Sequence, residues 1–117
     1  MDIQSLLHLL ALLLDLPLLR EPSLEAYQKD GDVIICIHKA QWDLYIAAVG
    51  AGGYYILPHA ISTKGGVEIR GGRIYVARGR SGALVLKLPT YAREITLVAE
   101  PKSLRLKLAA GGSCPHL

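Results

Sequence analysis

The chain has 117 residues, which suits one compact domain and leaves no room for a second core, and no repeat or linker divides it. Apolar residues make up 51% of the chain, but Phe is absent and Trp occurs once, so the core must be mainly aliphatic. The net charge of +3 is unevenly divided: residues 1–32 carry two basic and six acidic side chains, whereas residues 33–117 carry eleven basic and four acidic. We therefore expect an acidic helical lead and a basic body that either attracts polyanions or only keeps the protein soluble.

The numbers of Asn, Gln and Cys residues bear on the source organism and on disulfide bonding. Asn is absent and Gln occurs three times, a depletion that is part of the hyperthermophile pattern, so we expect a hyperthermophilic, archaeal source. Cys36 lies in an apolar run and Cys114 in a tail of Gly, Ser and Pro. Intracellular proteins of hyperthermophiles can hold disulfides, which leaves a bridge open, but we expect two free thiols.

The first predicted element is a helix over residues 2–16 that is apolar around most of its circumference and ends before Pro17. At about 1.5 Å per residue it is too short for a bilayer core of about 30 Å, and it lacks the basic leader and cleavage site of a secretory signal. We therefore expect no membrane span and a cytoplasmic, intracellular location. So wide an apolar surface is either sandwiched within the fold or paired with a second protomer. We favour a homodimer or other homo-oligomer, with the interface residues Leu6, Leu9, Leu10 and Leu13.

A short second helix is predicted from Pro22-Ser23 to about Lys29, since Pro and Ser suit a helix start and Gly31 suits its end. From Asp32 onward every segment indicates a strand, because alternating or continuous apolar runs are separated by turn residues. The run at 33–37 is continuously apolar and predicts a strand covered on both faces. About eight strands are expected, at 33–37, 44–49, 54–57, 67–70, 73–76, 83–88, 95–99 and 104–108.

The stretch 67–76 specifies a hairpin almost residue by residue, because Gly71-Gly72 can adopt the positive φ angles of a two-residue turn. The expected pairs are Val67 with Val76, Glu68 with Tyr75, Ile69 with Ile74, and Arg70 with Arg73. One face of the hairpin would then be aliphatic and the other mainly basic.

A second hairpin is predicted around residues 100–103 with the same division between an aliphatic and a basic face. Its expected pairs are Ile95 with Leu108, Leu97 with Leu106, Ala99 with Leu104, Thr96 with Lys107, and Val98 with Arg105.

These elements predict an α+β, mainly β fold in which the N-terminal helix and the short second helix pack on an antiparallel meander of about eight strands. The meander would be barrel-like or a sandwich, since closure protects strand edges. We expect a single domain over 1–117, with a helical lead at 1–31, a β body at 32–109 and a flexible tail at 110–117.

Motifs for catalysis, cofactors and metals are weak. The Gly-rich turn at 49–55 lacks the third glycine of a dinucleotide loop and the lysine of a P-loop, so a hairpin turn explains it. Cys36, His38 and His59 show no paired zinc spacing. Nothing indicates positioned acid/base groups or an activated nucleophile, so we expect no catalytic residues, no metal, no cofactor and no enzyme.

The basic strands carry the functional hypothesis, since Lys and Arg neutralise phosphates and exposed aromatic rings stack on bases. We predict a small protein that binds single-stranded DNA or RNA mainly through the backbone of the nucleic acid. The alternative for this face is a charged surface that serves solubility through ion pairs. The candidate residues are Arg70, Arg73, Tyr75, Arg78, Arg80, Lys87, Arg93, Arg105 and Lys107, with Tyr91 also interleaved.

Two further features leave alternatives open. Trp42 lies among polar residues and is either a loop anchor, which is commoner, or an exposed contact residue. The protein could instead be a protein-interaction or assembly module, cellular or viral, in which the leucine-rich helix is the functional part and the basic face only solubilises.

Overall fold

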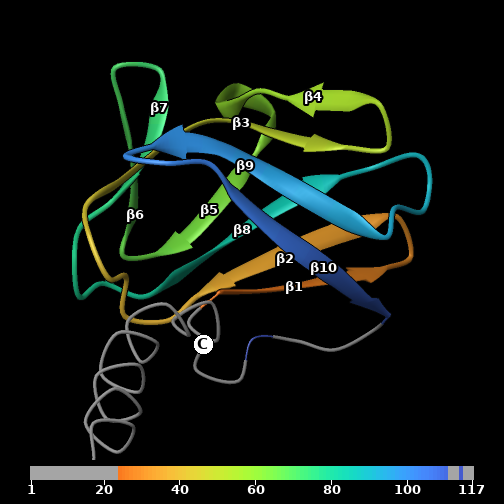
Figure 1. The fold of residues 1–117 in the computed structure, drawn as a ribbon, viewed down its shortest axis with the longest axis horizontal. Helices are drawn as coiled ribbons and strands as arrows, with labels where there is room; N and C mark the ends of the chain where they lie inside the picture. The colour runs from red at the N-terminus through yellow and green to blue at the C-terminus, as the bar shows by residue number, and fades with distance from the viewer. Residues whose placement is uncertain (1–23, 111–113, 115–117) are drawn as a thin grey trace, which may run out of the picture.

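A computed structural model describes residues 24–110 and 114 of the chain, which form a nearly closed β-barrel (Figure 1). Its strands are β1 Leu24–Lys29, β2 Asp32–Ile37, β3 Leu44–Ala51, β4 Tyr54–Ile56, β5 Ser62–Gly65, β6 Val67–Arg70, β7 Arg73–Val76, β8 Gly82–Lys87, β9 Glu94–Glu100 and β10 Leu104–Ala110. One short 3-10 helix, η2 Pro58–Ala60, follows β4.

All strands belong to one sheet in the order β5-β8-β2-β1-β10-β9-β3-β7-β6, with β4 added beside β3. The two end strands, β5 and β6, follow each other in the chain and lie close together, so only this seam keeps the barrel from closing fully. The pairing of β1 with β10 is parallel and the other pairs are antiparallel. The barrel-like architecture predicted from the sequence is thus present, but the strands do not follow a simple meander.

The predicted α+β class is wrong for the described residues, because the segment expected to form the second helix is strand β1. Ala26 and Gln28 are buried, whereas Glu25 and Tyr27 alternate with them on the outer side. The turn to β2 is made by Asp30 and Gly31, whose φ angles are 52° and 83°. The local helix signals are overridden because this segment fills the gap between β2 and β10 and satisfies both of their edges.

The helix predicted at residues 2–16 lies outside the described residues, and so do Leu6, Leu9, Leu10 and Leu13. In the part of the chain that the structure describes, no helix is both long enough and apolar enough to cross a membrane.

The core is aliphatic, as the composition predicts, and comes mainly from alternate, inward-pointing residues along the strands. Its fully buried large side chains are Val33, Ile35, Ile37, Ile46, Val49, Ile74, Val76, Leu84, Leu86, Leu88, Ile95 and Leu97. The predicted register of the β6–β7 hairpin is confirmed at all four pairs. Ile69 is nevertheless 52% exposed, because the tip of this hairpin extends beyond the barrel, as Figure 1 shows.

The register predicted for the last hairpin is wrong by two residues. Leu104 lies opposite Leu97 instead of Ala99, because β9 runs on to Glu100 alongside β3 and lengthens the connection. The Ala99 N–H donates a hydrogen bond to Ser103 Oγ within this connection. An even shift leaves each side chain on its predicted face, so the aliphatic side still points into the barrel.

A disulfide joins Cys36 to Cys114 with a Cα–Cα distance of 5.5 Å, so the prediction of two free thiols is wrong. Cys36 lies between the core residues Ile35 and Ile37 and therefore points to the outer side of β2. The chain that leaves β10 returns to this strand, with β1 lying between β10 and β2 in the sheet. The bond thus ties the end of the chain to the barrel wall.

The first prediction concerns this disulfide. Cys114→Ser should lower the free energy of unfolding by about 2–5 kcal/mol, because the crosslink restricts the unfolded chain. The measurement is denaturant unfolding with and without dithiothreitol. The reductant should lower the stability of the wild type and leave the variant unchanged, whereas equal stability of both proteins without reductant would contradict the prediction.

The second prediction concerns Gly82, where β8 passes close to the β5–β6 seam. A Cβ atom at this position would collide with the Lys64 carbonyl oxygen and with Val67 Cγ2. Gly82→Ala should therefore lower the free energy of unfolding by about 1–3 kcal/mol, measured by chemical denaturation. Gly71→Ala is the comparison: no other atom lies within 4 Å of a Cβ there, and its φ of 55° is the source of strain. If Gly82→Ala were as stable as the wild type, the seam would not be tightly packed.

Candidate functional site

A row of outward side chains crosses four neighbouring strands at one end of the barrel. Glu68 on β6 pairs with Tyr75 on β7, Tyr75 pairs with Tyr45 on β3, and Tyr45 pairs with Glu100 on β9. Because paired residues point to the same side of a sheet, the row forms one continuous strip on the outer wall. Two tyrosines are thus flanked by a carboxylate on each side.

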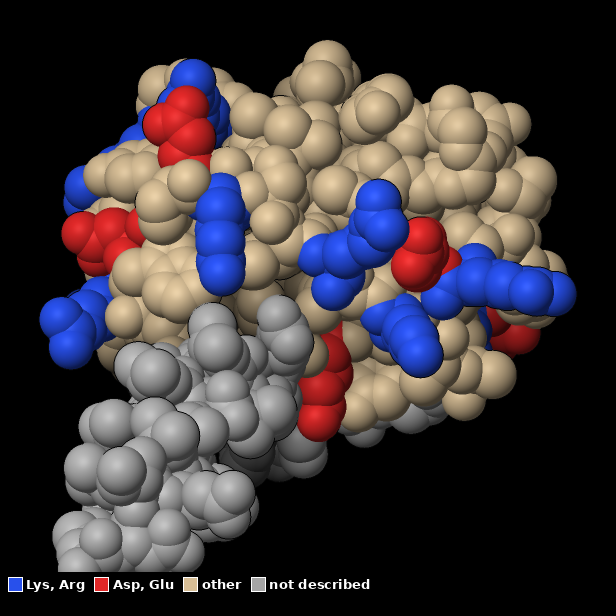
Figure 2. All heavy atoms as spheres, viewed as in Figure 1, with Lys and Arg blue, Asp and Glu red and all other residues tan. Residues whose placement is uncertain are grey.

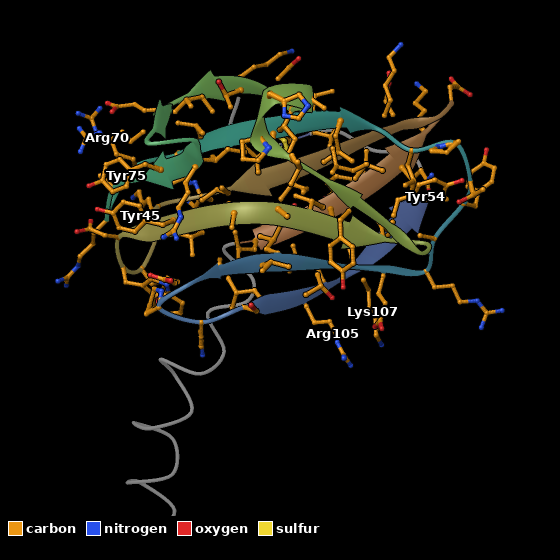
Figure 3. All side chains as sticks on the ribbon, turned by 90° about the horizontal axis from the view of Figure 1, so that it is seen from above. Tyr45, Tyr54, Arg70, Tyr75, Arg105 and Lys107 are labelled. Atoms are coloured by element: carbon orange, nitrogen blue, oxygen red, sulfur yellow. A yellow bond between two sulfur atoms is a disulfide. The ribbon has the colours of Figure 1, made fainter. Side chains whose placement is uncertain are left out.

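The aromatic rings in this row stack on each other and on an arginine. The ring centroids of Tyr45 and Tyr75 lie 4.8 Å apart with an interplanar angle of 32°. The Arg70 guanidinium carbon lies 4.4 Å from the centroid of the Tyr75 ring. Figure 3 shows these three side chains together at one end of the molecule. We call Arg70, Tyr75 and Tyr45 the tyrosine stack.

Two arginines of the β6–β7 hairpin, Arg70 and Arg73, form ion pairs with the carboxylates of the row. Arg70 Nε lies 2.9 Å from Glu68 Oε2, and Arg73 Nη1 lies 3.6 Å from Glu100 Oε2. All four side chains are about half exposed or more, so each pair contributes only about 0–1 kcal/mol. Among residues 24–110 and 114, which include twelve basic side chains, no other ion pair is formed within 4 Å.

A surface depression of about 330 Å³ lies next to the tyrosine stack. The residues that line it are Arg70, Tyr75, Arg80, Glu68, Ala77, Gly65 and Gly66. The loop that carries Arg80 is held in place, since the Arg80 carbonyl accepts a hydrogen bond from the Ala40 N–H. Two guanidinium groups and an aromatic ring around a shallow depression can bind an anion that carries a planar group.

Arg78 lies in the same loop, and its N–H donates a hydrogen bond to Asp43 Oδ1 over 2.9 Å. The structure therefore brings five of the nine predicted binding residues to one end of the barrel. These are Arg70, Arg73, Tyr75, Arg78 and Arg80.

The other four predicted binding residues lie elsewhere. Arg105 and Lys107 are on the outer side of β10, away from the tyrosine stack, as Figure 3 shows. Lys87 is opposite Asp32 at the end of β8, and Arg93 is in the loop before β9. Figure 2 shows basic side chains spread over one face with acidic ones between them, so the predicted basic surface is not continuous.

Tyr45 is the member of the tyrosine stack that the sequence prediction missed. It lies between the buried residues Leu44 and Ile46, and this alternation would have placed an aromatic ring on the outer face of the strand. Nothing in the sequence pairs β3 with β7, because that contact joins segments about 30 residues apart and depends on the sheet order.

The ionisation of Tyr75 reflects its surroundings. Desolvation by the neighbouring protein raises the pKa of the Tyr75 phenol above its usual value of 10.0, and the negative charge of Asp43 raises it further. The positive charge of Arg70 acts in the opposite direction and lowers the pKa. The neutral phenol is therefore the form present at neutral pH.

The remaining sequence features have structural explanations. Trp42 is partly buried against the core, and Lys102 Nζ lies 5.2 Å from its ring centroid, in agreement with a loop anchor. The Gly-rich turn connects β3 and β4, where Gly52 and Gly53 have positive φ angles. Within the described residues, no three His, Cys, Asp or Glu side chains are grouped closely enough to hold a metal ion.

Comparison of the chain with protein-family models, with curated proteins and with solved structures finds no match.

The third prediction concerns the contact between Arg70 and Tyr75. Arg70→Gln should raise the pKa of Tyr75 further, because it removes the nearby positive charge that stabilises the phenolate. NMR titration of the tyrosine ring carbons measures this shift. Arg93→Gln removes the same charge outside the site and should leave the Tyr75 titration unchanged. A lower pKa in Arg70→Gln would contradict the contact.

Proposed function

We propose that the protein binds single-stranded nucleic acid at the end of the barrel that carries the tyrosine stack. The observation that supports this function best is the stack itself: partly exposed aromatic rings lie beside the depression lined by Arg70 and Arg80. A base would stack against the aromatic surface while the guanidinium groups contact phosphates. This arrangement has little means of reading sequence, because neither stacking nor phosphate contact distinguishes bases.

The charge balance of the described residues also supports binding. They carry twelve basic and seven acidic side chains, yet only Arg70 and Arg73 form ion pairs within 4 Å there. An ion-pair network that serves stability or solubility alone would pair more of these cations. The two pairs that do form are solvent-exposed, so a phosphate can compete with the carboxylates at small energetic cost.

The alternative function, an assembly module that acts through the leucine-rich segment, depends on residues outside the described part of the chain. No observation in the described part favours it over nucleic-acid binding.

The fourth prediction tests the proposed function with a fluorescent single-stranded oligonucleotide. Binding should weaken steeply as salt rises, because phosphate contacts release counterions. Tyr45→Ala should weaken binding by about tenfold through the loss of stacking, which corresponds to about 1.4 kcal/mol. Arg80→Ala should lower the slope of log affinity against log salt by about one.

Lys87→Ala is the matched control for these variants, since it removes one positive charge far from the tyrosine stack. It should change the affinity by less than about twofold if the stack and its depression form the binding site. Absence of binding by the wild type at low salt would refute the proposed function. An equal loss in Lys87→Ala and Arg80→Ala would refute the location of the site.

A further inference from the structure

A second row of outward residues crosses the same wall farther along β3. Tyr55 on β4 pairs with Gly50 on β3, Gly50 pairs with Thr96 on β9, and Thr96 pairs with Arg105 on β10. These residues share the outer face, because Gly50 lies between the buried residues Val49 and Ala51. An aromatic ring, a hydroxyl group and a guanidinium group therefore lie in one line across the wall.

Tyr55 is supported by the backbone beneath it and is open to solvent elsewhere. A Cβ atom on Gly50 would lie 3.0 Å from Cε1 of the Tyr55 ring, so the ring packs closely over the bare backbone of this glycine. The side chain is nevertheless 73% exposed. A tyrosine ring that rests on a strand with most of its surface open is a suitable platform for a planar ligand.

Arg105 provides the charged end of this row. It lies between the buried residues Leu104 and Leu106, and Figure 3 shows its side chain pointing away from the barrel. It makes no ion pair within 4 Å with another described residue. Gly50 and Arg105 are two strand spacings apart, about 10 Å at roughly 4.8 Å per strand.

We propose that Tyr55, Thr96 and Arg105 form a second nucleotide subsite, in which a base stacks on Tyr55 and Arg105 binds a phosphate. This inference rests on the proposed function, and it defines the ligand as a single strand long enough to reach both subsites. Tyr45 and Gly50 are five positions apart on β3, about 16 Å at roughly 3.3 Å per residue. A strand of several nucleotides that follows β3 can therefore contact the tyrosine stack and Tyr55 at once.

Occupation of two linked subsites makes affinity depend on the length of the ligand. Once one base is bound at the tyrosine stack, the next part of the strand is held near Tyr55 at high effective concentration. A ligand too short to span the two rows gains nothing from this linkage. The wild type should therefore bind a long oligonucleotide much more tightly than a short one of the same composition.

The test compares oligothymidylates of twelve and three nucleotides by fluorescence anisotropy at low salt, and it provides the fifth prediction. Tyr55→Ala and Arg105→Ala should each weaken binding of the longer ligand by about tenfold and reduce its advantage over the shorter one. Tyr55→Phe keeps the ring and should retain the affinity. Tyr91→Ala is the control: Tyr91 is 82% exposed but belongs to neither row, so its removal should leave binding unchanged.

The outcomes separate this inference from the proposed function. If Tyr55→Ala and Arg105→Ala bind the longer ligand as tightly as the wild type while Arg80→Ala binds it weakly, the second subsite is refuted and the first stands. If the wild type binds neither ligand, the proposed function is refuted and the second subsite with it. If Tyr91→Ala weakens binding as much as Tyr55→Ala, the loss is not specific to the row, and the second subsite is refuted.

Discussion

The parallel pairing of β1 with β10 joins the first and last described strands. It connects strands β5, β8, β2 and β1 to strands β10, β9, β3, β7 and β6, so that all of them form one continuous wall. Its register is short, from Ala26 opposite Leu108 to Gln28 opposite Ala110. Without this contact, β1 and β10 would each present an open edge to solvent. Gln28, at the end of this pairing, is buried, and the loop between β8 and β9 satisfies its side-chain amide, which donates to the Thr90 carbonyl and accepts from the Ala92 N–H.

Because the sheet curves into a barrel, the inward residues of each strand form the core and the outward residues form the surface. The interior is filled by aliphatic side chains from alternating positions, so the outward positions of the same strands make no contribution to the core. Tyr45, Tyr75 and Tyr55 occupy such positions and remain partly or largely exposed. Their place on regular strands, rather than on loops, holds the rings in defined positions, which is what a stacking surface requires.

The charged side chains on this wall lie in separate small groups and do not form one continuous basic surface. At the tyrosine stack the arginines lie beside carboxylates, whereas Arg105 projects from β10 opposite the uncharged Thr96. Exposed pairs of this kind stabilise the fold little, so the cations remain available to an external phosphate. The two rows thus carry similar side chains, aromatic rings and arginines, at separate places along β3.

Sequence analysis predicted the aliphatic core, the inward and outward faces of most strands, and the register of the β6–β7 hairpin. These follow from alternation and from Gly71-Gly72, which act over a few residues. Sequence analysis did not predict that residues 24–29 form a strand, that Cys36 bonds to Cys114, or that Tyr45 stacks on Tyr75. Each of these features depends on contacts between distant segments. The order of strands in the sheet decides which strand pairs with an open edge, which thiol lies near another, and which rings stack. Local preference cannot specify these partners.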